Sequence, residues 1–178
     1  VVERDSEIRM MMEILGRHSR PNVLIIGDSG VGKTALVEGL ISGIVEDKAP
    51  SFLLGATVYE LDTGALVAGA TYKGEIEDRL KGIIQDIRKL EKAILFIDDI
   101  HVLLDPKQGN SGAASILKPE LSRGDLTIIG TTSVDEYRKI IEPDQAFNRR
   151  FEVLELNEPD LDTASRMVSA VLGRYADF

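Results

Sequence analysis

Residues 22–34, "NVLIIGDSGVGKT", decide the fold of this 178-residue chain. A short apolar run rich in branched residues ends at Gly27, and a glycine-rich segment leads from there into a helical stretch. The segment "GDSGVGKT" (27–34) matches the pattern G-x-x-x-x-G-K-[ST], in which backbone N–H groups at a helix N-terminus surround phosphate oxygens. An ordinary glycine-rich turn would not require the whole pattern between a strand and a helix. The sequence therefore predicts a phosphate-binding loop.

The loop predicts how ATP and Mg²⁺ are held. The residues expected to bind the phosphates are Gly27, Asp28, Ser29, Gly30, Val31, Gly32, Lys33 and Thr34. Lys33 is expected to reach the β- and γ-phosphates, and Thr34 is expected to ligate Mg²⁺ through its hydroxyl.

A second motif supplies two carboxylates. The apolar run in "ILFIDDIH" (94–101) ends at Asp98 and Asp99. Asp98 is expected to hold the metal beside the loop, and Asp99 to orient and deprotonate the attacking water. A solvated strand end would explain one aspartate, but not its pairing with an upstream phosphate loop. His101 has no histidine neighbour in the sequence, and we interpret it as a structural residue.

Short apolar runs alternate with helical stretches along the chain. The predicted strands are 22–27, 57–62, 93–98, 126–132 and 151–156. Residues 74–91, including Leu90, carry apolar residues at helical spacing, with charges on the other face. Near-continuous apolar strands separated by helices predict an α/β fold with a parallel sheet covered on both faces. A loop is expected over 105–113, and a last helix over 160–173 with Asp160 or Asp162 as its N-cap.

Composition narrows the class of protein. The net charge of −9 disfavours sequence-independent binding of nucleic acid, which needs clustered lysine and arginine. No apolar run approaches the roughly 18 residues of a membrane span, so no membrane contact is expected. The absence of cysteine excludes disulfides and thiolate metal sites. The first residues, "VVERD", include no initiator methionine, and we expect a piece of a longer, cytoplasmic protein.

Four stretches resemble the first ATPase module of Clp-type unfoldases and disaggregases, within the AAA+ class. They read "GVGKTALVEGL" (30–40), "LDTGALVAGATYKGEIEDRLKGI" (61–83), "ILFIDDIHVLL" (94–104) and "LKPELSRGDLTIIGTTSVDEYRKIIEPDQAFNRRF" (117–151). The resemblance implies a three-layer P-loop NTPase fold with five parallel strands in the order 5-1-4-3-2. It implies that residues 1–178 form the large α/β subdomain, with a helical lid outside this chain. It also implies a ring, usually a hexamer, with ATP and Mg²⁺ between neighbouring subunits.

The resemblance further assigns residues that act on the γ-phosphate. Ser133 would be its sensor, with Thr132 close behind. Arg149 and Arg150 would reach the ATP of the next subunit, where positive charge stabilises the anionic transition state. On the sequence alone, a surface pair that bridges acids such as Glu152 is an equal alternative, and the resemblance favours the first interpretation.

The resemblance also places "GATYKGE" (69–75) at the central pore. Tyr72 and Lys73 would grip a translocating polypeptide there, because an aromatic ring offers a large contact area to any sequence. Without the resemblance, a lone tyrosine in a loop is more often half-buried packing.

Asp99 departs from the family, which usually has glutamate at this position. Its carboxylate falls short by about 1.5 Å, one C–C bond, and a misplacement of about 1 Å can cost of order 10²-fold in rate. Two functions follow: a motor that hydrolyses ATP and threads unfolded or aggregated polypeptides, in some branches toward a ClpP-type protease, or an ATP-binding assembly module with little hydrolysis. A clamp loader or helicase acting on DNA is a third, which the acidic charge disfavours.

Overall fold

The computed structural model describes residues 4–16, 22–28, 30–72, 74–105, 111–123 and 126–157. Two site residues from the sequence analysis, Ser29 and Lys73, lie outside these ranges. The expected helix over 160–173, with its N-cap Asp160 or Asp162, also lies outside them.

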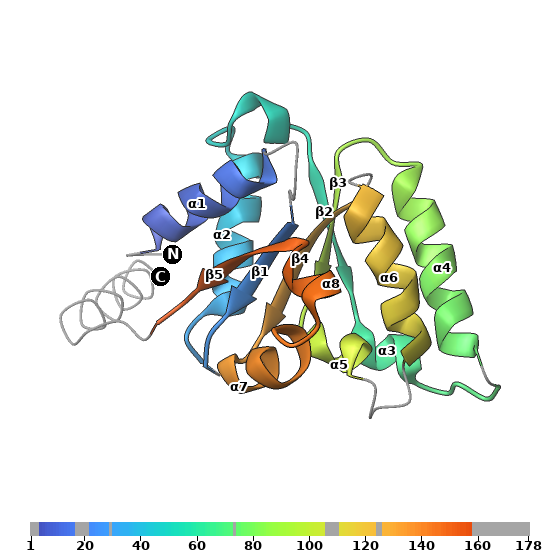
Figure 1. Ribbon diagram of the computed structural model, residues 1–178. Helices are drawn as coiled ribbons and strands as arrows, with labels where there is room; N and C mark the ends of the chain where they lie inside the picture. Colours follow the sequence, from blue (N-terminus) through green and yellow to red (C-terminus); the bar gives the residue numbers. More distant parts are fainter. Residues whose placement is uncertain are drawn as a thin grey trace, which may run out of the picture.

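Five strands form one parallel sheet in the order β2-β3-β4-β1-β5 (Figure 1). They are β1 (Asn22–Ile26), β2 (Thr57–Leu61), β3 (Ala93–Ile97), β4 (Thr127–Thr132) and β5 (Phe151–Glu155). The predicted strand order is therefore confirmed, and each predicted strand extends one residue beyond the observed one. All of β1 is buried, whereas the edge strands β2 and β5 are partly exposed.

Helices cover both faces of the sheet (Figure 1). The helices α1 (Asp5–Leu15) and α2 (Lys33–Val45) pack on one face, and α4 (Glu75–Arg88) and α6 (Ser111–Arg123) on the other. Successive strand residues point to opposite faces. Val23 and Ile25 accordingly join the core under α1 and α2, while Leu24 and Ile26 join the core under α4 and α6. Burial on both faces explains why the central strands β1, β3 and β4 read as near-continuous apolar runs.

Shorter helices complete the part of the chain that the structure describes. They are η1 (Ser51–Leu53), α3 (Thr63–Val67), α5 (His101–Leu104), α7 (Val134–Glu136), the π-helix η3 (Tyr137–Ile141) and α8 (Gln145–Asn148). Within the described ranges, no helix is long and apolar enough to cross a membrane.

The structure corrects the sequence analysis at two element ends. The helix expected over 74–91 ends at Arg88, and Leu90 lies beyond it with 45% of its surface exposed. The loop expected over 105–113 is too long, because α6 already begins at Ser111 and buries Ala113 in the core.

Asn22 is a buried polar residue that ties three strands together. Its Oδ1 accepts the N–H of Ile128 in β4 at 2.9 Å, and its Nδ2 donates to the carbonyl of Arg150, just before β5, at 3.3 Å. The side chain thus anchors the backbone at which the predicted arginine pair emerges.

We expect Asn22→Ala to lower the free energy of unfolding by about 1–3 kcal/mol, because it leaves a buried N–H without its acceptor. Urea denaturation of the chain measures this change. Gln85→Ala, at an exposed position of α4, is the matched control and should stay within about 0.5 kcal/mol. Equal stability of the two variants would contradict the role given to Asn22.

Candidate functional site

The phosphate loop leaves the carboxyl end of β1, and two of its glycines are required by geometry. A Cβ at Gly27 would approach the carbonyl oxygen of Leu156 and the side chain of Val31 to 2.8 Å. Gly32, the N-cap of α2, has φ +96°, a left-handed conformation that glycine adopts without steric cost. The glycines of the motif therefore stand where this turn needs them.

Lys33 and Thr34 begin α2, so both stand beside the positive end of the helix dipole. Nζ of Lys33 donates to the carbonyl oxygen of Gly27 at 2.6 Å, which folds the lysine over its own loop. Thr34 and Asp28 are exposed, and Val31 is buried beneath the loop. The described part of the loop thus presents a lysine, a hydroxyl and backbone N–H groups at one helix N-terminus.

A buried arginine that the sequence analysis missed braces this loop. Arg4 donates through Nη2 to the carbonyl of Val31 at 3.2 Å and to the carbonyl of Asn157 at 2.9 Å. Its Nη1 pairs with Glu7 at 3.4 Å. The start of α1 is therefore tied both to the phosphate loop and to the segment after β5. Only the position of Arg4 before an amphipathic helix could have signalled this, and that signal is weak.

The two aspartates of the second motif follow β3, at the same edge of the sheet as the phosphate loop. The carboxyl ends of neighbouring parallel strands meet at one edge, and the register pairs Ile97 with Gly130 and Ile26 with Thr132. Asp98 is half-buried and Asp99 is exposed. Asp99 has φ +52°, an unusual backbone conformation for a residue other than glycine.

Thr131, at the end of β4, bonds to both aspartates and was not singled out from the sequence. Its hydroxyl donates a short hydrogen bond to Oδ1 of Asp98 and accepts the N–H of Asp99 at 3.0 Å. The structure therefore joins the acidic motif and the end of β4 into one cluster. Threonine is common in strands, so the residue type alone gave no indication of this contact.

The two predicted sensor residues follow Thr131. Thr132 is fully buried, and its Oγ1 lies 2.8 Å from Nδ1 of His101, which agrees with a structural part for that histidine. Its carbonyl accepts the N–H of Gly27 at 3.3 Å, so the end of β4 contacts the phosphate loop. The hydroxyl of Ser133 accepts the N–H of Glu136 at 3.1 Å and caps α7.

The donor set fits Mg²⁺ bound together with phosphates. Among the residues that the structure describes, no group of three or more His, Cys, Asp or Glu side chains could hold a metal by itself. Mg²⁺ usually takes one or two carboxylates and completes its octahedron with waters and substrate phosphates. A carboxylate from Asp98 and a hydroxyl from Thr34 are donors of the kind that this ion prefers.

The arginine pair, Arg149 and Arg150, lies at the amino ends of the strands, opposite to the carboxyl ends at which the phosphate loop begins. Arg149 is exposed and donates through Nη2 to Oε1 of Gln145 at 3.3 Å, while the carbonyl of Arg150 is held by Asn22. Asn22 begins β1 and Gly27 follows its end, so the five residues of β1 separate the pair from the phosphate loop by about 16 Å at about 3.3 Å per residue. The structure does not bring the arginines together with the phosphate loop of their own chain.

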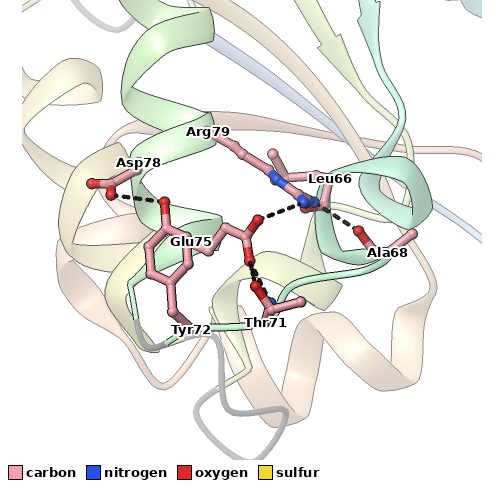
Figure 2. A network of polar contacts seen from close by, with 7 residues as sticks. All are labelled: Leu66, Ala68, Thr71, Tyr72, Glu75, Asp78 and Arg79. Carbon is pink, nitrogen blue, oxygen red and sulfur yellow. Dashed lines mark hydrogen bonds and ion pairs between the residues drawn. The ribbon is translucent and has the colours of Figure 1, made fainter.

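Tyr72 stands at the surface before α4, with 57% of its surface exposed. Its hydroxyl donates to Oδ2 of Asp78 at 3.4 Å (Figure 2). The half-buried packing that a lone loop tyrosine usually adopts is therefore wrong for this residue. Lys73 is outside the described residues.

A network centred on Glu75 and Arg79 fixes the loop before Tyr72 (Figure 2). The carboxylate of Glu75 accepts a short hydrogen bond from the N–H of Thr71, and Arg79 pairs with it at 2.9 Å. Arg79 also donates to the carbonyls of Leu66 and Ala68, each at 2.8 Å. The spacing of Glu75 and Arg79, four residues apart on one helix face, could have signalled their ion pair from the sequence.

Comparisons with known proteins agree with this geometry. The family model described as "ATPase family associated with various cellular activities (AAA)" matches residues 23–158. The chain is 46% identical over 178 residues to the chaperone protein ClpB of Bacteroides thetaiotaomicron, with 98% of this chain and 21% of that protein covered. It is 42% identical over 177 residues to the negative regulator of genetic competence ClpC/MecB of Bacillus subtilis, with 98% and 22% covered. The chain thus spans about a fifth of the length of these relatives.

Solved structures of Hsp104 share the fold. The closed state of Hsp104 with ATPγS and FITC casein has a TM-score of 0.88 and 43% identity, and the match covers 98% of this chain and 30% of that chain. The Saccharomyces cerevisiae Hsp104–ADP complex has a TM-score of 0.88 and 43% identity, with 98% and 25% covered. At these identities the likeness extends beyond the fold to the sequence.

The network around Glu75 generates a prediction about the loop before Tyr72. Replacing Glu75 by alanine removes the acceptor for the N–H of Thr71, so amide exchange at Thr71 should be about 2- to 10-fold faster. Hydrogen exchange resolved by residue measures this, with Glu77→Ala on the same helix as the matched control. Equal rates at Thr71 in the two variants would contradict the network.

The same network makes the protection of the Thr71 amide against exchange depend on pH. The N–H of Thr71 and, to a smaller extent, Arg79 lower the pKa of Glu75 below its ordinary value. Protection at Thr71 should therefore persist at the ordinary pKa of a glutamate and be lost only as the pH falls further, through the lowered pKa.

Proposed function

The chain belongs to the AAA family of ATPases, and from this membership we propose that it is the ATP-binding and ATP-hydrolysing module of a ring-forming protein-remodelling motor. The motor would unfold or disaggregate polypeptides in the cytoplasm by threading them through a central pore. The observation that carries the proposal is the meeting of the phosphate loop with Asp98 and Asp99 at one edge of the sheet. The identity to ClpB and ClpC, and the casein in the matching Hsp104 structure, support the choice of polypeptide as substrate.

ATP would bind with its phosphates against the N–H groups of the loop from Gly27 to Thr34. Lys33 would exchange its contact with the carbonyl of Gly27 for the β- and γ-phosphates. Thr34 and Asp98 are the residues that would hold Mg²⁺, which when bound neutralises charge on the phosphates. A helical lid outside this chain would close over the nucleotide.

Asp99 would act as the base. Its exposed carboxylate would take a proton from the attacking water, the water oxygen would bond to the γ-phosphorus, and the bond from that phosphorus to the leaving oxygen of ADP would break. The hydroxyl of Ser133 would read the γ-phosphate. Because Oγ already accepts the N–H of Glu136, it would donate its own proton to a phosphate oxygen while it still caps α7. Thr132, whose hydroxyl meets His101, would support Ser133 from behind.

Arg149 and Arg150 would act on the ATP of a neighbouring subunit. Their position at the other end of β1, about 16 Å of strand away, supports action between subunits. An arginine that reaches a neighbour's γ-phosphate contributes about 10³–10⁵ in rate in comparable enzymes. We accordingly propose a ring, with a hexamer as the expected size. Where such a ring feeds a protease, a ClpP-type protease would be the partner.

Tyr72 and Lys73 would grip the polypeptide in the pore. The exposure of Tyr72, and the bracing of the loop before it by Glu75 and Arg79, support this assignment. An aromatic ring can transmit a pulling force when the loop before it is held in place, because the loop does not bend as the polypeptide pulls on the ring.

The ATPase proposal predicts a rank order of ATP turnover rates for four versions of the intact protein, in each of which any second ATPase site is inactivated. The unaltered protein should turn over ATP, and Asp99→Asn should lower the rate by about 10²-fold or more, as for loss of a general base. Lys33→Ala should prevent phosphate binding. Asp99→Glu should raise the rate by up to about 10²-fold, because the longer side chain restores the reach of the carboxylate. Steady-state phosphate release measures all four.

One outcome would refute hydrolysis by Asp99. If Asp99→Asn equals the unaltered protein while Asp99→Glu is faster, the module binds ATP as an assembly clamp.

The pore assignment predicts that Tyr72→Ala lowers the threading of an unfolded fluorescent polypeptide by about tenfold or more while ATP turnover continues. The physical reason is the loss of the aromatic contact area. Tyr72→Phe keeps the ring and removes only the bond to Asp78, so it is the matched control and should retain threading. Threading by Tyr72→Ala at the unaltered rate would exclude Tyr72 from the pore.

A further inference from the structure

Three hydroxyl residues follow one another at the end of β4 and just beyond it, and each has a different partner. Thr131 bonds to the acidic motif, Thr132 meets His101, and Ser133 caps α7. The family resemblance assigned a function only to the second and third of them. Thr131 is fully buried, as Thr132 is, and its hydroxyl bonds to both Asp98 and Asp99.

The direction of the hydrogen bonds at Thr131 follows from its partners. A backbone N–H can only donate, so Oγ1 accepts from Asp99 at 3.0 Å. An ionised carboxylate can only accept, so the single hydroxyl proton of Thr131 points to Oδ1 of Asp98. The side chain of Thr131 therefore uses both its O–H donor and one acceptor lone pair in hydrogen bonds to two successive residues, Asp98 and Asp99.

The contact with Asp98 restricts how that carboxylate can turn. Oδ1 is engaged by the hydroxyl inside the protein, so among the contacts of the described residues Oδ2 is the oxygen that can turn toward a metal. Hydrogen bonds of this kind, from a neighbouring group to a metal-binding carboxylate, orient the ligand, and their loss typically costs 10- to 100-fold in metal affinity or activity.

The contact with Asp99 restricts its backbone. A residue other than glycine stays in a left-handed conformation only when its surroundings hold it there. Thr131 supplies two such restraints, because its hydroxyl accepts the N–H of Asp99 and its carbonyl accepts the N–H of Ile100 at 3.0 Å. The side chain of Ile100 packs closely over Gly130, where an added Cβ would meet it at 3.1 Å. The turn is thus fixed on both sides of Asp99.

We propose that Thr131 is a positioning residue of the ATPase site, whose hydroxyl sets the metal-facing oxygen of Asp98 and the direction of the Asp99 carboxylate together. This inference rests on the proposed function, because it takes its consequence from the parts given to Asp98 and Asp99. A buried threonine that only stabilised the turn would affect folding but not the dependence of the site on Mg²⁺.

The test uses the intact protein with Thr131→Val, which removes the hydroxyl and keeps the shape. Thr131→Ser restores the hydroxyl, and Thr127→Val makes the same change at the start of β4 as the matched control. A fluorescent ATP analogue is titrated with and without Mg²⁺. Thr131→Val should leave metal-free binding unchanged and raise the Mg²⁺ concentration for half-maximal tight binding by about 10- to 100-fold. Thr131→Ser and Thr127→Val should both match the unaltered protein.

A second readout needs neither nucleotide nor metal. In Thr131→Val the N–H of Asp99 loses its acceptor, so its amide should exchange faster than in Thr131→Ser. An unchanged Mg²⁺ dependence in Thr131→Val would overturn the inference. If Thr131→Val does not fold, Thr131→Cys, of similar size with a weaker donor, takes its place under the same criterion.

Different results would refute the nucleotide site and the positioning function of Thr131. An unaltered protein that binds the analogue no better than Lys33→Ala refutes the nucleotide site itself. An unaltered protein whose binding depends on Mg²⁺, with Thr131→Val identical to it, refutes only the positioning part of Thr131. Because binding is the readout, the test holds whether or not the site turns ATP over.

Discussion

The central strands of this parallel sheet are buried on both faces, which leaves only their ends for polar side chains, and this constraint decides where the site residues lie. Along β1 every residue is buried, and the alternate residues fill two separate cores. Charged or hydroxyl groups in the middle of such a strand would lose their hydration without gaining partners. The phosphate loop, the acidic motif and the hydroxyl residues therefore collect at the carboxyl edge, while the arginine pair stands at the amino edge. The two edges are a strand length apart, which supports the proposal that a second subunit completes the ATPase site.

The same constraint explains how much the sequence could predict. The central strands β1, β3 and β4, buried on both faces, produce near-continuous apolar runs, and the partly exposed β2 and β5 still carry short β-rich runs. All five were therefore found to within one residue, and the phosphate motif between a strand and a helix indicated the fold. The strand order came from the family resemblance. Local patterns decide the strand bounds and the phosphate motif, but not the strand order. The end of the helix at Arg88 was missed because Leu90 continues the apolar period although the backbone has already left the helix.

Contacts between segments far apart in the sequence could not be predicted from local sequence patterns. Thr131 is 32 residues from Asp99 in the chain, and only the pairing of β3 with β4 brings its hydroxyl to the acidic motif. Arg4 is 27 residues from Val31 and reaches it only after α1 has packed beside β1. Neither residue type is distinctive for such a contact. The ion pair of Glu75 with Arg79 is different, since its spacing is local and its signal was present in the sequence.

The turn that Thr131 holds also bears on the unusual aspartate. In a left-handed conformation the Cβ of an ordinary residue crowds the following carbonyl, at a cost of about 1–2 kcal/mol, and aspartate and asparagine adopt it more readily than longer side chains. Asp99 therefore suits the backbone of this turn, and its departure from glutamate creates no additional strain. The side chain of Asp99, however, extends less far from the backbone than that of a glutamate. Because the turn is fixed by Thr131 and Ile100, the backbone cannot easily advance to restore that reach, so Asp99 acting as the proposed base would need a bridging water or would react more slowly.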